Sequence, residues 1–525
     1  MTTPIDSSFK KLTSIEENLH RELVTDSHPK GIADVTTEFL SYLPRDNRDK
    51  EFAPVARVCK NWHASSSNSR IANKQLESIT TLTNKEIENW KIIFQNRYHQ
   101  LLTSVELIQK CPNLRTLDFS NMDISDDELQ KIVLGIANSR SIRELKFRDC
   151  KNLVDPSFEG LNFIQNLVFN GSSLLNAPCL EAMTSLSRLE ISNCGRCAIY
   201  KFPDLPSLKI FKVNSCTLTI NADFSNLLSL EELDFHGSTF ASTSSYSFRG
   251  VPTVKKISFA YCENVNTLHI SEPMPNLKEL SFEGCQDFRG LTMKEHQVPP
   301  LLETVNFSKC NRIVNFSNLK IPSLKHLSFK DCGFLEEVDL TFLPFLETLD
   351  LSGCKLLMKL KYVPVHLQEL FLANCYWLQS LSWNMKNLRI LSLKGCRFKN
   401  VHLQKMSSLQ KLDLRNCRLV TLIDFQGLHS LQKATLKGCT ELRNIEFDNH
   451  PELTHLSLSN CSKISKINFT GARFLEKLWL NDCTSLENLN LSKLPNLKKL
   501  FIKNCPKLKS EAIDHFRDKI EIISD

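Results

Sequence analysis

One phrase, L-x-x-L-x-[FL]-x-x-C, returns every 21 or 22 residues across most of this 525-residue chain. Aligned on that phrase, the sequence contains 18 units, the first beginning at Leu114 and the last at Leu497. The step is 28 residues after the first unit and 23 to 25 residues between residues 230 and 302. A compact core stops growing near ~250–300 residues, so a chain of this length needs either several domains or a repeat. The periodic phrase indicates a repeat.

The phrase predicts a short strand in every unit, because its apolar residues alternate with polar ones. This spacing is typical of leucine-rich repeats, whose stacked strands form a parallel sheet on the concave side of a curved solenoid. Several units carry proline just before the next strand, as in LPSL at 205, IPSL at 321 and LPNL at 494. Proline breaks helices and keeps the preceding residue extended. We therefore predict an α/β leucine-rich-repeat solenoid of about 18 repeats over residues 112–508, with a mostly non-helical convex side.

Helical spacing is expected only near the ends of the solenoid. ISDDELQKIVLGIANS (124–139) predicts a helix with Ser125 as its N-cap. SEAIDHFRDKI (510–520) predicts a capped amphipathic helix that covers the last repeat, within a C-terminal cap and tail at 509–525. Residues 73–111 are expected to be a helical linker and N-terminal cap, with the helix over 85–111.

Cysteine closes the phrase in most units, which raises the question of whether the thiols pack or react. Zinc needs clustered sets of four ligands, whereas this pattern supplies one thiol per repeat. A buried free cysteine is a small apolar group with a weakly hydrogen-bonding sulfur, so packing is favoured over a metal or disulfides. The pair Cys194 and Cys197 is the single CxxC and keeps a metal site as the lesser alternative. The 15 ladder positions are Cys150, Cys194, Cys216, Cys262, Cys285, Cys310, Cys332, Cys354, Cys375, Cys396, Cys417, Cys439, Cys461, Cys483 and Cys505.

The first 110 residues lack the repeat and form a separate module. In GIADVTTEFLSYLPRDNRDKEFAPVARVCKNWH (31–63), TTEFLSYL predicts a short amphipathic helix, Pro44 begins a turn, and EFAPVARVCKNWH predicts a second helix. The apolar face of these helices is too large for so small a module to bury fully, which is typical of a docking surface. Its residues are Leu40, Leu43, Val55, Val58, Cys59 and Trp62.

The segments FLSYLP and VARVCKNW resemble the F-box, which F-box proteins often place before cysteine-ended leucine-rich repeats. The resemblance implies that this module, residues 28–72 after a flexible stretch at 1–27, is all-α and docks a Skp-type adaptor of a cullin ubiquitin ligase. Ile32-Ala33 stands where the motif usually has Leu-Pro, and the repeats are shorter than those of F-box proteins. They are equally similar to the repeats of plant-type immune receptors and bacterial repeat proteins. The alternative for the N-terminal module is a helical cap of the solenoid.

Catalytic and targeting signals are not found in the sequence. It contains no G-x-x-x-x-G-K, G-x-S-x-G, H-E-x-x-H or paired CxxC motif, so we expect neither an enzyme nor a cofactor. The N-terminal stretch has no apolar core, and no apolar run is long enough to span a membrane. We expect a cytoplasmic or nuclear protein, or one in the host cytosol if it is a secreted bacterial effector. The net charge of +7 is modest for this length, so nucleic acid is not an expected partner.

The concave face offers candidate residues for a client protein. Exposed aromatic residues are unexpected in a polar row and are expected only in the C-terminal half, at Phe371, Trp479 and Phe501. Stacked cations cost energy unless something anionic meets them. These cations are Lys394, Lys411, Arg415, Lys433 and Lys437. The alternative is an ordinary solvated face with scattered charge.

An acidic cluster on earlier strands could orient or repel the same client. It consists of Glu232, Asp234, Glu279 and Glu283. Taken together, the sequence predicts a substrate-recognition adaptor of a Skp-cullin-F-box-type ubiquitin ligase whose solenoid binds an unknown client. The alternative is a leucine-rich-repeat interaction scaffold, such as a bacterial effector or immune-type recognition protein, without a ubiquitin link.

Overall fold

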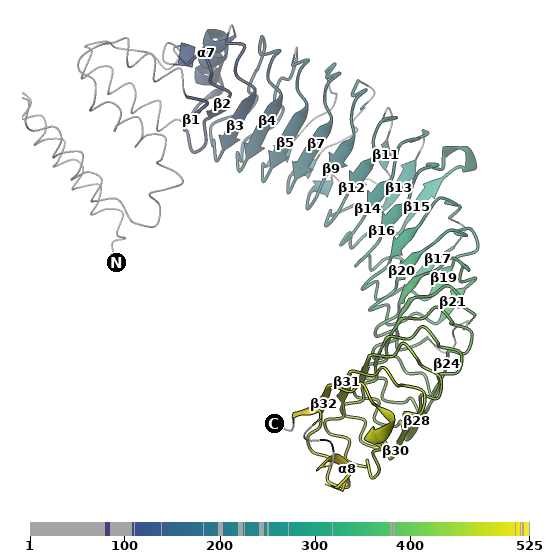
Figure 1. Cartoon of the computed structure of the whole chain (residues 1–525). Helices are drawn as coiled ribbons and strands as arrows, with labels where there is room; N and C mark the ends of the chain where they lie inside the picture. Colours follow the sequence, from purple (N-terminus) through teal and green to yellow (C-terminus); the bar gives the residue numbers. More distant parts are fainter. Residues whose placement is uncertain are drawn as a thin grey trace, which may run out of the picture.

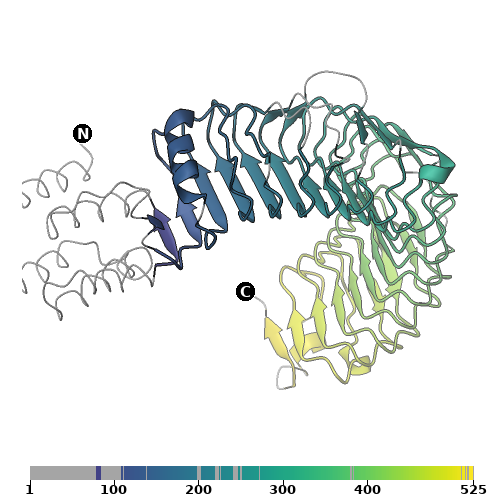
Figure 2. The same cartoon turned by 90° about the horizontal axis from the view of Figure 1, so that it is seen from above.

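The repeats build a curved solenoid, and the strands of its main sheet follow the inner side of the arc (Figures 1 and 2). The computed structural model describes residues 79–83, 108–109, 111–137, 139–181, 183–197, 203–218, 224, 226–240, 246–248, 251–270, 272–317, 319–378, 381, 384–509, 511–514, 516 and 519–523. The predicted F-box-like module at 28–72 and the stretch before it lie outside these residues. No helix among the described residues is long and apolar enough to cross a membrane.

The main sheet contains 20 strands within the described residues, and every neighbouring pair is parallel. All 18 strands predicted from the repeat lie in it, which confirms the leucine-rich-repeat solenoid. Along the solenoid the strands are β1 (Thr81–Thr83), β2 (Thr116–Asp118), β3 (Glu144–Arg148), β4 (Asn166–Asn170), β5 (Arg188–Ser192), β7 (Ile210–Asn214), β9 (Glu232–Asp234), β12 (Lys256–Ser258), β14 (Glu279–Ser281), β16 (Thr304–Asn306), β18 (His326–Ser328), β20 (Thr348–Asp350), β22 (Glu369–Phe371), β23 (Ile390–Ser392), β25 (Lys411–Asp413), β27 (Lys433–Thr435), β29 (His455–Ser457), β31 (Lys477–Trp479), β32 (Lys499–Phe501) and β33 (Glu521–Ile523).

Short strands are the main regular elements of the outer side within the described residues, which agrees with the predicted mostly non-helical convex side. They form separate small parallel sheets, interrupted by the 3-10 helices η2 (Glu295–Gln297) and η3 (Leu491–Lys493). The outer strands are β6 (Arg196–Cys197), β8 (Thr217–Leu218) and β10 (Thr239–Phe240); β11 (Tyr246–Phe248), β13 (Thr267–Ile270) and β15 (Gly290–Met293); β17 (Asn315–Phe316), β19 (Glu337–Asp339) and β21 (Lys359–Lys361); β24 (Asn400–His402) and β26 (Leu422–Asp424); and β28 (Asn444–Glu446) and β30 (Lys466–Asn468).

The core lies between the inner and outer strands, where one leucine of each phrase stacks on the next. The second residue of each main strand from β1 to β32 is buried, as Leu412 is in β25, and the residues on either side of it face the concave surface. In the central repeats phenylalanine continues the stack. The rings of Phe259 and Phe282 lie parallel, 5.2 Å apart. Burial of this continuous stack is the main stabilising term, since an isolated repeat cannot bury its own apolar face.

The helix predicted in the first unit is present as α7 (Asp126–Ile136). Ser125 caps it, because the Ser125 side chain accepts from the backbone of Glu128 while the Glu128 carboxylate accepts from the backbone of Ser125. Leu129, Val133 and Ile136 are its buried residues. The long step of 28 residues between the first two units therefore holds a helix where later units have an extended segment.

The C-terminal prediction was wrong in length and type. Helix α8 is only Glu511–Asp514, and residues 521–523 form β33 rather than a tail. The edge of β32 has unpaired backbone groups unless something covers it. The β-branched run IEII supplies a strand: the backbone N–H of Ile502 donates to Ile523 O at 2.9 Å, and Ile520 is buried.

The N-terminal end was also predicted incompletely. The expected helical linker over 73–111 contains strand β1, in which Leu82 is buried between two threonines and pairs with Leu117 of β2. Of the helix expected over 85–111 the structure describes only residues 108, 109 and 111, and Ile108 and Cys111 are buried in the core. Both ends of the repeat array are thus extended by one strand that lacks the repeat phrase.

A left-handed residue follows each predicted strand, one position before the cysteine. Asparagine, aspartate or glycine fills most of these positions, since they adopt positive φ most readily. Where this position holds glycine, the equivalent position one repeat earlier often holds a longer residue. At Gly353 (φ +80°) a Cβ would collide with the carboxylate of Asp331, which lies at the same position one repeat earlier.

Candidate functional site

The concave face carries three rows of outward residues that run along the solenoid axis. The strand-start row and the strand-end row are the first and third residues of each main strand, which flank the buried leucine. The turn row is the residue two positions after the strand end, for example Arg415 after Asp413. Backbone hydrogen bonds between neighbouring turns keep this row aligned: Gly395 N–H donates to Arg415 O at 2.8 Å, and Asn416 N–H donates to Lys437 O at 2.7 Å.

In the N-terminal part of the concave face, the charges compensate one another. Lys146 lies 3.1 Å from Glu144, and Arg188 lies 2.8 Å from Glu190. The predicted acidic cluster is likewise engaged: Glu232 pairs with Lys212 at 2.8 Å and Glu279 with Lys256 at 3.2 Å. These partly exposed pairs contribute little to stability, but they leave the surface locally near neutral.

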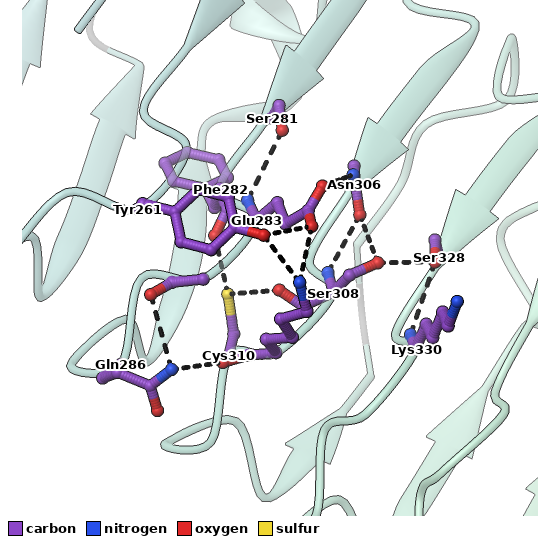
Figure 3. Close-up of polar contacts among 12 residues, drawn as sticks. Tyr261, Ser281, Phe282, Glu283, Gln286, Asn306, Ser308, Cys310, Ser328 and Lys330 are labelled. Atoms are coloured by element: carbon purple, nitrogen blue, oxygen red, sulfur yellow. Dashed lines mark hydrogen bonds and ion pairs between the residues drawn. The ribbon is translucent and has the colours of Figure 1, made fainter. Parts of the chain in front are cut away.

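The fourth member of that cluster, Glu283, lies in a polar network (Figure 3). Its carboxylate accepts from Tyr261 Oη at 2.8 Å and from Lys309 Nζ at 3.0 Å, and Lys309 also donates to Tyr261 Oη at 2.6 Å. Partial burial opposes the effect, but these hydrogen bonds hold the pKa of Glu283 below its ordinary value. Asn306 donates to Glu283 and accepts from Ser308, which also contacts Ser328. The network satisfies its own charges and fixes neighbouring turns.

The strand-start row changes character at β25. From there it reads Lys411, Lys433, His455, Lys477 and Lys499, and the strand pairing places these residues directly beside one another. Lys499 pairs with Glu521 at 2.8 Å. Within the described part of the chain, Lys411, Lys433 and Lys477 form no ion pair. Like charges on adjacent strands repel, so this row favours an anionic neighbour.

The predicted turn-row cations do lie one above another, but they are not equivalent. Arg415 makes a forked contact with Asp413, with Nη2 to Oδ2 at 2.7 Å and Nε to Oδ1 at 2.9 Å. The carboxylate compensates the guanidinium and raises its pKa further. Lys394 and Lys437 have no ion-pair partner in the residues that the structure describes. Strand-start Lys411 and Lys433 lie on the other side of the strand-end row.

Two of the three predicted aromatic residues meet. Trp479 and Phe501 lie face to face with ring centroids 5.0 Å apart and an angle of 7° between the planes. The His455 ring, from the neighbouring strand β29, also stacks on Trp479, with ring centroids 6.2 Å apart and an angle of 26° between the planes. Phe371 lies in β22 between Asp350 and Ser392, five strand steps before Trp479, so it is not part of this aromatic cluster. We call His455, Trp479 and Phe501 the aromatic stack.

His455 links the lysines to the aromatic residues and was not singled out in the sequence. It is half-buried, and burial together with Lys433 and Lys477 lowers its pKa, which opposes its protonation in the free protein. Glu476 acts in the opposite sense. The alignment column that gave Lys411 and Lys433 contains His455, Lys477 and Lys499 as well, so continuing that column to the last unit would have found them.

The cysteines form a hydrogen-bonded ladder rather than a reactive site. Cys285 Sγ donates to Phe259 O at 2.9 Å, and Cys417 Sγ donates to Leu393 O at 3.0 Å. The same thiol-to-carbonyl bond spans about one repeat at most ladder positions. Burial raises the pKa of Cys417 to about 12, so the thiol stays protonated and donates. The 17 cysteines whose side chains the structure describes are free, and no group of metal-ligating side chains occurs among the described residues.

Three units carry Met122, Ser172 and Ser238 in place of the cysteine, and the two serines clarify what the cysteine does. Ser238 Oγ donates to Val213 O at 2.7 Å, which reproduces the ladder bond. Ser172 Oγ is buried without a hydrogen-bond partner among the described residues. A small hydrogen-bond donor is therefore tolerated at this position. Cysteine suits it because a thiol is nearly apolar, so its burial costs little free energy even where its hydrogen bond is weak.

The predicted adaptor-binding residues lie outside the described residues, and their role stays a prediction. They are Leu40, Leu43, Pro44, Val55, Val58, Cys59 and Trp62.

Similarity to known proteins is confined to the repeats. The BspA type leucine rich repeat region matches residues 65–198, 252–356, 367–477 and 414–524 in six copies. A comparison with curated proteins found no match. Among solved structures, the functional domain of InlJ from Listeria monocytogenes, which includes a cysteine ladder, is 18% identical with a TM-score of 0.42 over 57% of this chain and 66% of that domain. YopM from Yersinia enterocolitica is 16% identical with a TM-score of 0.43 over 79% of this chain and 85% of its own.

The family match covers more than half of the sequence, and its segments contain every strand of the main sheet except β7 and β9. It includes residues 65–72, which the sequence analysis gave to the F-box-like module, and nothing in these comparisons supports that module. The chain belongs to the BspA-type leucine-rich repeat family.

Proposed function

We propose that the protein is a leucine-rich-repeat interaction scaffold that binds an acidic protein segment on the C-terminal half of its concave face. The observation that carries this proposal is the set of unpaired lysines on adjacent strands beside the aromatic stack. In the N-terminal half lysines and acidic neighbours pair on the concave face, whereas in this half Lys411, Lys433 and Lys477 form no ion pair among the described residues, although Arg415 and Lys499 do. The proposal assigns the chain no catalytic step.

The two kinds of side chain have separate roles in this proposal. The lysines attract an anionic partner over about a Debye length, ~8–10 Å, and accelerate its association. The rings of Trp479 and Phe501 offer apolar area that is released from water on binding and slows dissociation.

A protein partner fits the aromatic stack better than single-stranded nucleic acid. Bases bind proteins by stacking on exposed ring faces. Here Trp479 faces Phe501 on one side and His455 on the other, so its edge is the part left to a partner. Edges suit aliphatic or aromatic side chains, which make edge-to-face and dispersion contacts.

The test is charge reversal on the full chain. Lys411, Lys433 and Lys437 changed together to glutamate should slow association of an acidic partner at least tenfold and remove most of its salt dependence. Arg415 is left intact, because removing it would leave Asp413 without its counter-charge. Binding of oligo-glutamate peptides and of a single-stranded oligonucleotide, measured by stopped-flow fluorescence over a salt series, gives the comparison.

The matched control reverses three exposed lysines away from the concave face. Lys399 precedes β24, Lys405 follows it, and Lys466 belongs to β30. The same change in net charge at these positions should leave association within about twofold, because screening limits their reach. Equal loss in both variants would show that only net charge matters and would overturn the concave site. Preferential binding of a nucleic acid over the acidic peptides would overturn the partner class.

The ubiquitin-ligase link is a separate proposal that rests on FLSYLP and VARVCKNW alone. The full chain should co-purify with a Skp-type protein, and a variant with Trp62→Ala and Leu43→Asp should not, while both keep the same thermal transition. Absence of a complex with the unaltered chain at micromolar concentration leaves the scaffold without an adaptor role.

A further inference from the structure

We infer that the acidic segment bound on this face is an α-helix lying across the strands, with carboxylates on both of its flanks. The inference rests on the proposed function and specifies its partner. It comes from the spacing and direction of two rows, which the strand register fixes. The strand-start row runs from Lys411 to Lys499, and the turn row is cationic beside its first part, at Lys394, Arg415 and Lys437, and continues with the uncharged Ser459 and Asn481.

The direction of the rows sets the direction of the partner. The strand-start row runs from Lys411 to Lys499 along the solenoid axis, perpendicular to the strands. A segment that contacts successive residues of the row must cross the strands. Pairing as an added strand is not available there, since β25 to β32 are bonded to neighbours on both edges. A helix satisfies its own backbone and needs no edge.

The spacing along the row fits a helix. Neighbouring strands lie about 4.8 Å apart, whereas one helical turn rises about 5.4 Å and two residues of an extended chain span about 6.7 Å. Over the four steps from Lys411 to Lys499 the mismatch is about 2.4 Å for a helix and about 7.6 Å for an extended chain. Long lysine side chains absorb the first difference and not the second.

The spacing between the rows fits as well. The strand-start and turn rows are four residues apart, as Lys433 and Lys437 are, which places their backbones at most about 13 Å apart. A helix with its side chains is about 10–12 Å wide. Between the rows the strand-end residues of β23 to β29 are short, namely Ser392, Asp413, Thr435 and Ser457.

The aromatic stack fixes the position of the helix along the row. Trp479 and Phe501 occupy the strand-end row in β31 and β32, at one end of the run of short residues. An apolar side chain at the corresponding end of the partner helix would meet their edges. The partner is therefore an amphipathic acidic helix of about 13 residues or more, given a rise of about 1.5 Å per residue.

The test uses three labelled synthetic peptides of about 18 residues, the first two of identical composition, titrated into the full chain by fluorescence anisotropy. The first has glutamates in two stripes on opposite flanks of the helix, at i, i+4, i+7, i+11 and i+14 and at i+2, i+5, i+9 and i+12, with leucines near one end. The second places the glutamates at alternate residues, and the third is the first with one central residue replaced by proline. We expect the first to bind at least tenfold more tightly than either other peptide and to gain helical circular dichroism on binding.

Three outcomes separate the inference from the function on which it rests. If the alternating peptide binds as tightly as the first, or if proline has no effect, the helix is wrong and the anionic-partner function stands. If none of the three binds at micromolar concentration, the proposed function fails and the helix with it. If the first peptide still binds more tightly than the other two after Lys411, Lys433 and Lys437 are reversed to glutamate, the helix binds elsewhere and the inference is overturned.

Discussion

Trp479 and Phe501 occupy the same position on adjacent strands and stack with their planes 7° apart. The four preceding strands of the main sheet carry short side chains at this position, namely Ser392, Asp413, Thr435 and Ser457. Parallel strands bring equivalent residues of neighbouring repeats into contact, so each aromatic ring covers part of the other. Half-burial of both rings keeps them rigid before a partner arrives. Rigid aromatic anchors lose little conformational entropy on binding.

Replacement of Trp479 by alanine should weaken binding of an acidic, apolar-ended peptide by about 2 kcal/mol or more, mainly through faster dissociation. The association rate should change little, because the lysines are untouched. Surface plasmon resonance separates the two rates. The matched control is Phe474→Ala, which removes an exposed ring of the same repeat outside the strand. An equal effect of both substitutions would contradict the role of the stack.

His455 should make peptide binding pH-dependent. Burial and the neighbouring lysines Lys433 and Lys477 hold the pKa of His455 below its ordinary value, and Glu476 only partly offsets them. A bound carboxylate favours the imidazolium and raises that pKa, so binding takes up a proton. Affinity should rise as the pH falls from about 7.5 to about 5.5. His455→Gln should remove this slope; a slope that persists in the variant would assign it to another group.

The ladder bond of Cys417 should be worth about 1 kcal/mol. Cys417→Ala removes both the sulfur and the donor to Leu393 O, whereas Cys417→Ser keeps a donor, as Ser238 does. Serine should therefore destabilise less than alanine if its hydroxyl reaches the carbonyl. Guanidinium denaturation followed by circular dichroism measures the difference. Stoichiometric zinc in the purified protein, or loss of metal from the variants, would contradict the packing role.

The sequence predicted which residues share a row, because the repeat places equivalent positions on adjacent strands. It could not predict from one row that Arg415 is compensated and Lys437 is not. The difference comes from the strand-end residue two positions earlier, which is Asp413 in one repeat and Thr435 in the other. Reading the strand-end and turn rows together would have predicted it. The parallel stacking of Trp479 on Phe501 depends on rotamers, which the pattern does not encode.

The two end strands show the other limit of the sequence pattern. β1 and β33 lack the repeat phrase, so periodicity does not find them. What places them is the unpaired edge of the neighbouring strand, together with short β-branched segments such as Thr81–Thr83. Edge pairing is a tertiary effect that appears only when the neighbouring strands are in position.

Substitution of Gly353 by alanine should cost at least about 1–2 kcal/mol, since an L-residue is strained in the left-handed region. The new Cβ would also collide with the side chain of Asp331 and come within 3.1 Å of its Cα, so a side-chain rotation alone does not relieve the contact. The double variant with Asp331→Ala should recover only part of the loss. Gly290→Ala is the control, because no atom lies within 4 Å of its Cβ position. Equal thermal transitions for the two alanine variants would contradict this account.

His450 should make stability fall in acid. It is buried between Phe425 and Phe447, its Nε2 lies 3.1 Å from Phe425 O, and its Nδ1 has no partner among the described residues. The carbonyl contact assigns the proton to Nε2 in the neutral ring. The pKa of His450 is lowered, mainly by burial and to a smaller extent by the nearby His429. The contact with Phe425 O and the charge of Asp448 act in the opposite direction and offset part of this shift.

Because the folded pKa lies below the unfolded one, the unfolded chain binds more protons as the pH drops below about 6.5. The free energy of unfolding should be independent of His450 above that pH and should decrease below it, by about 1.4 kcal/mol for each unit of the pKa difference, until the folded pKa is passed.

The variant His450→Leu tests this dependence. Leu428 occupies the equivalent position one repeat earlier, and the backbone carbonyls of Leu428 and His450 accept equivalent turn hydrogen bonds, so leucine suits the position. The variant should lose the part of the acid sensitivity that arises between about pH 6.5 and pH 5, measured by thermal denaturation across that range. His402→Leu is the comparison, since His402 is an exposed residue of β24 and should leave the profile nearly unchanged. If the leucine variant at 450 melts with the same pH profile as the unaltered chain, the acid sensitivity lies in another buried group.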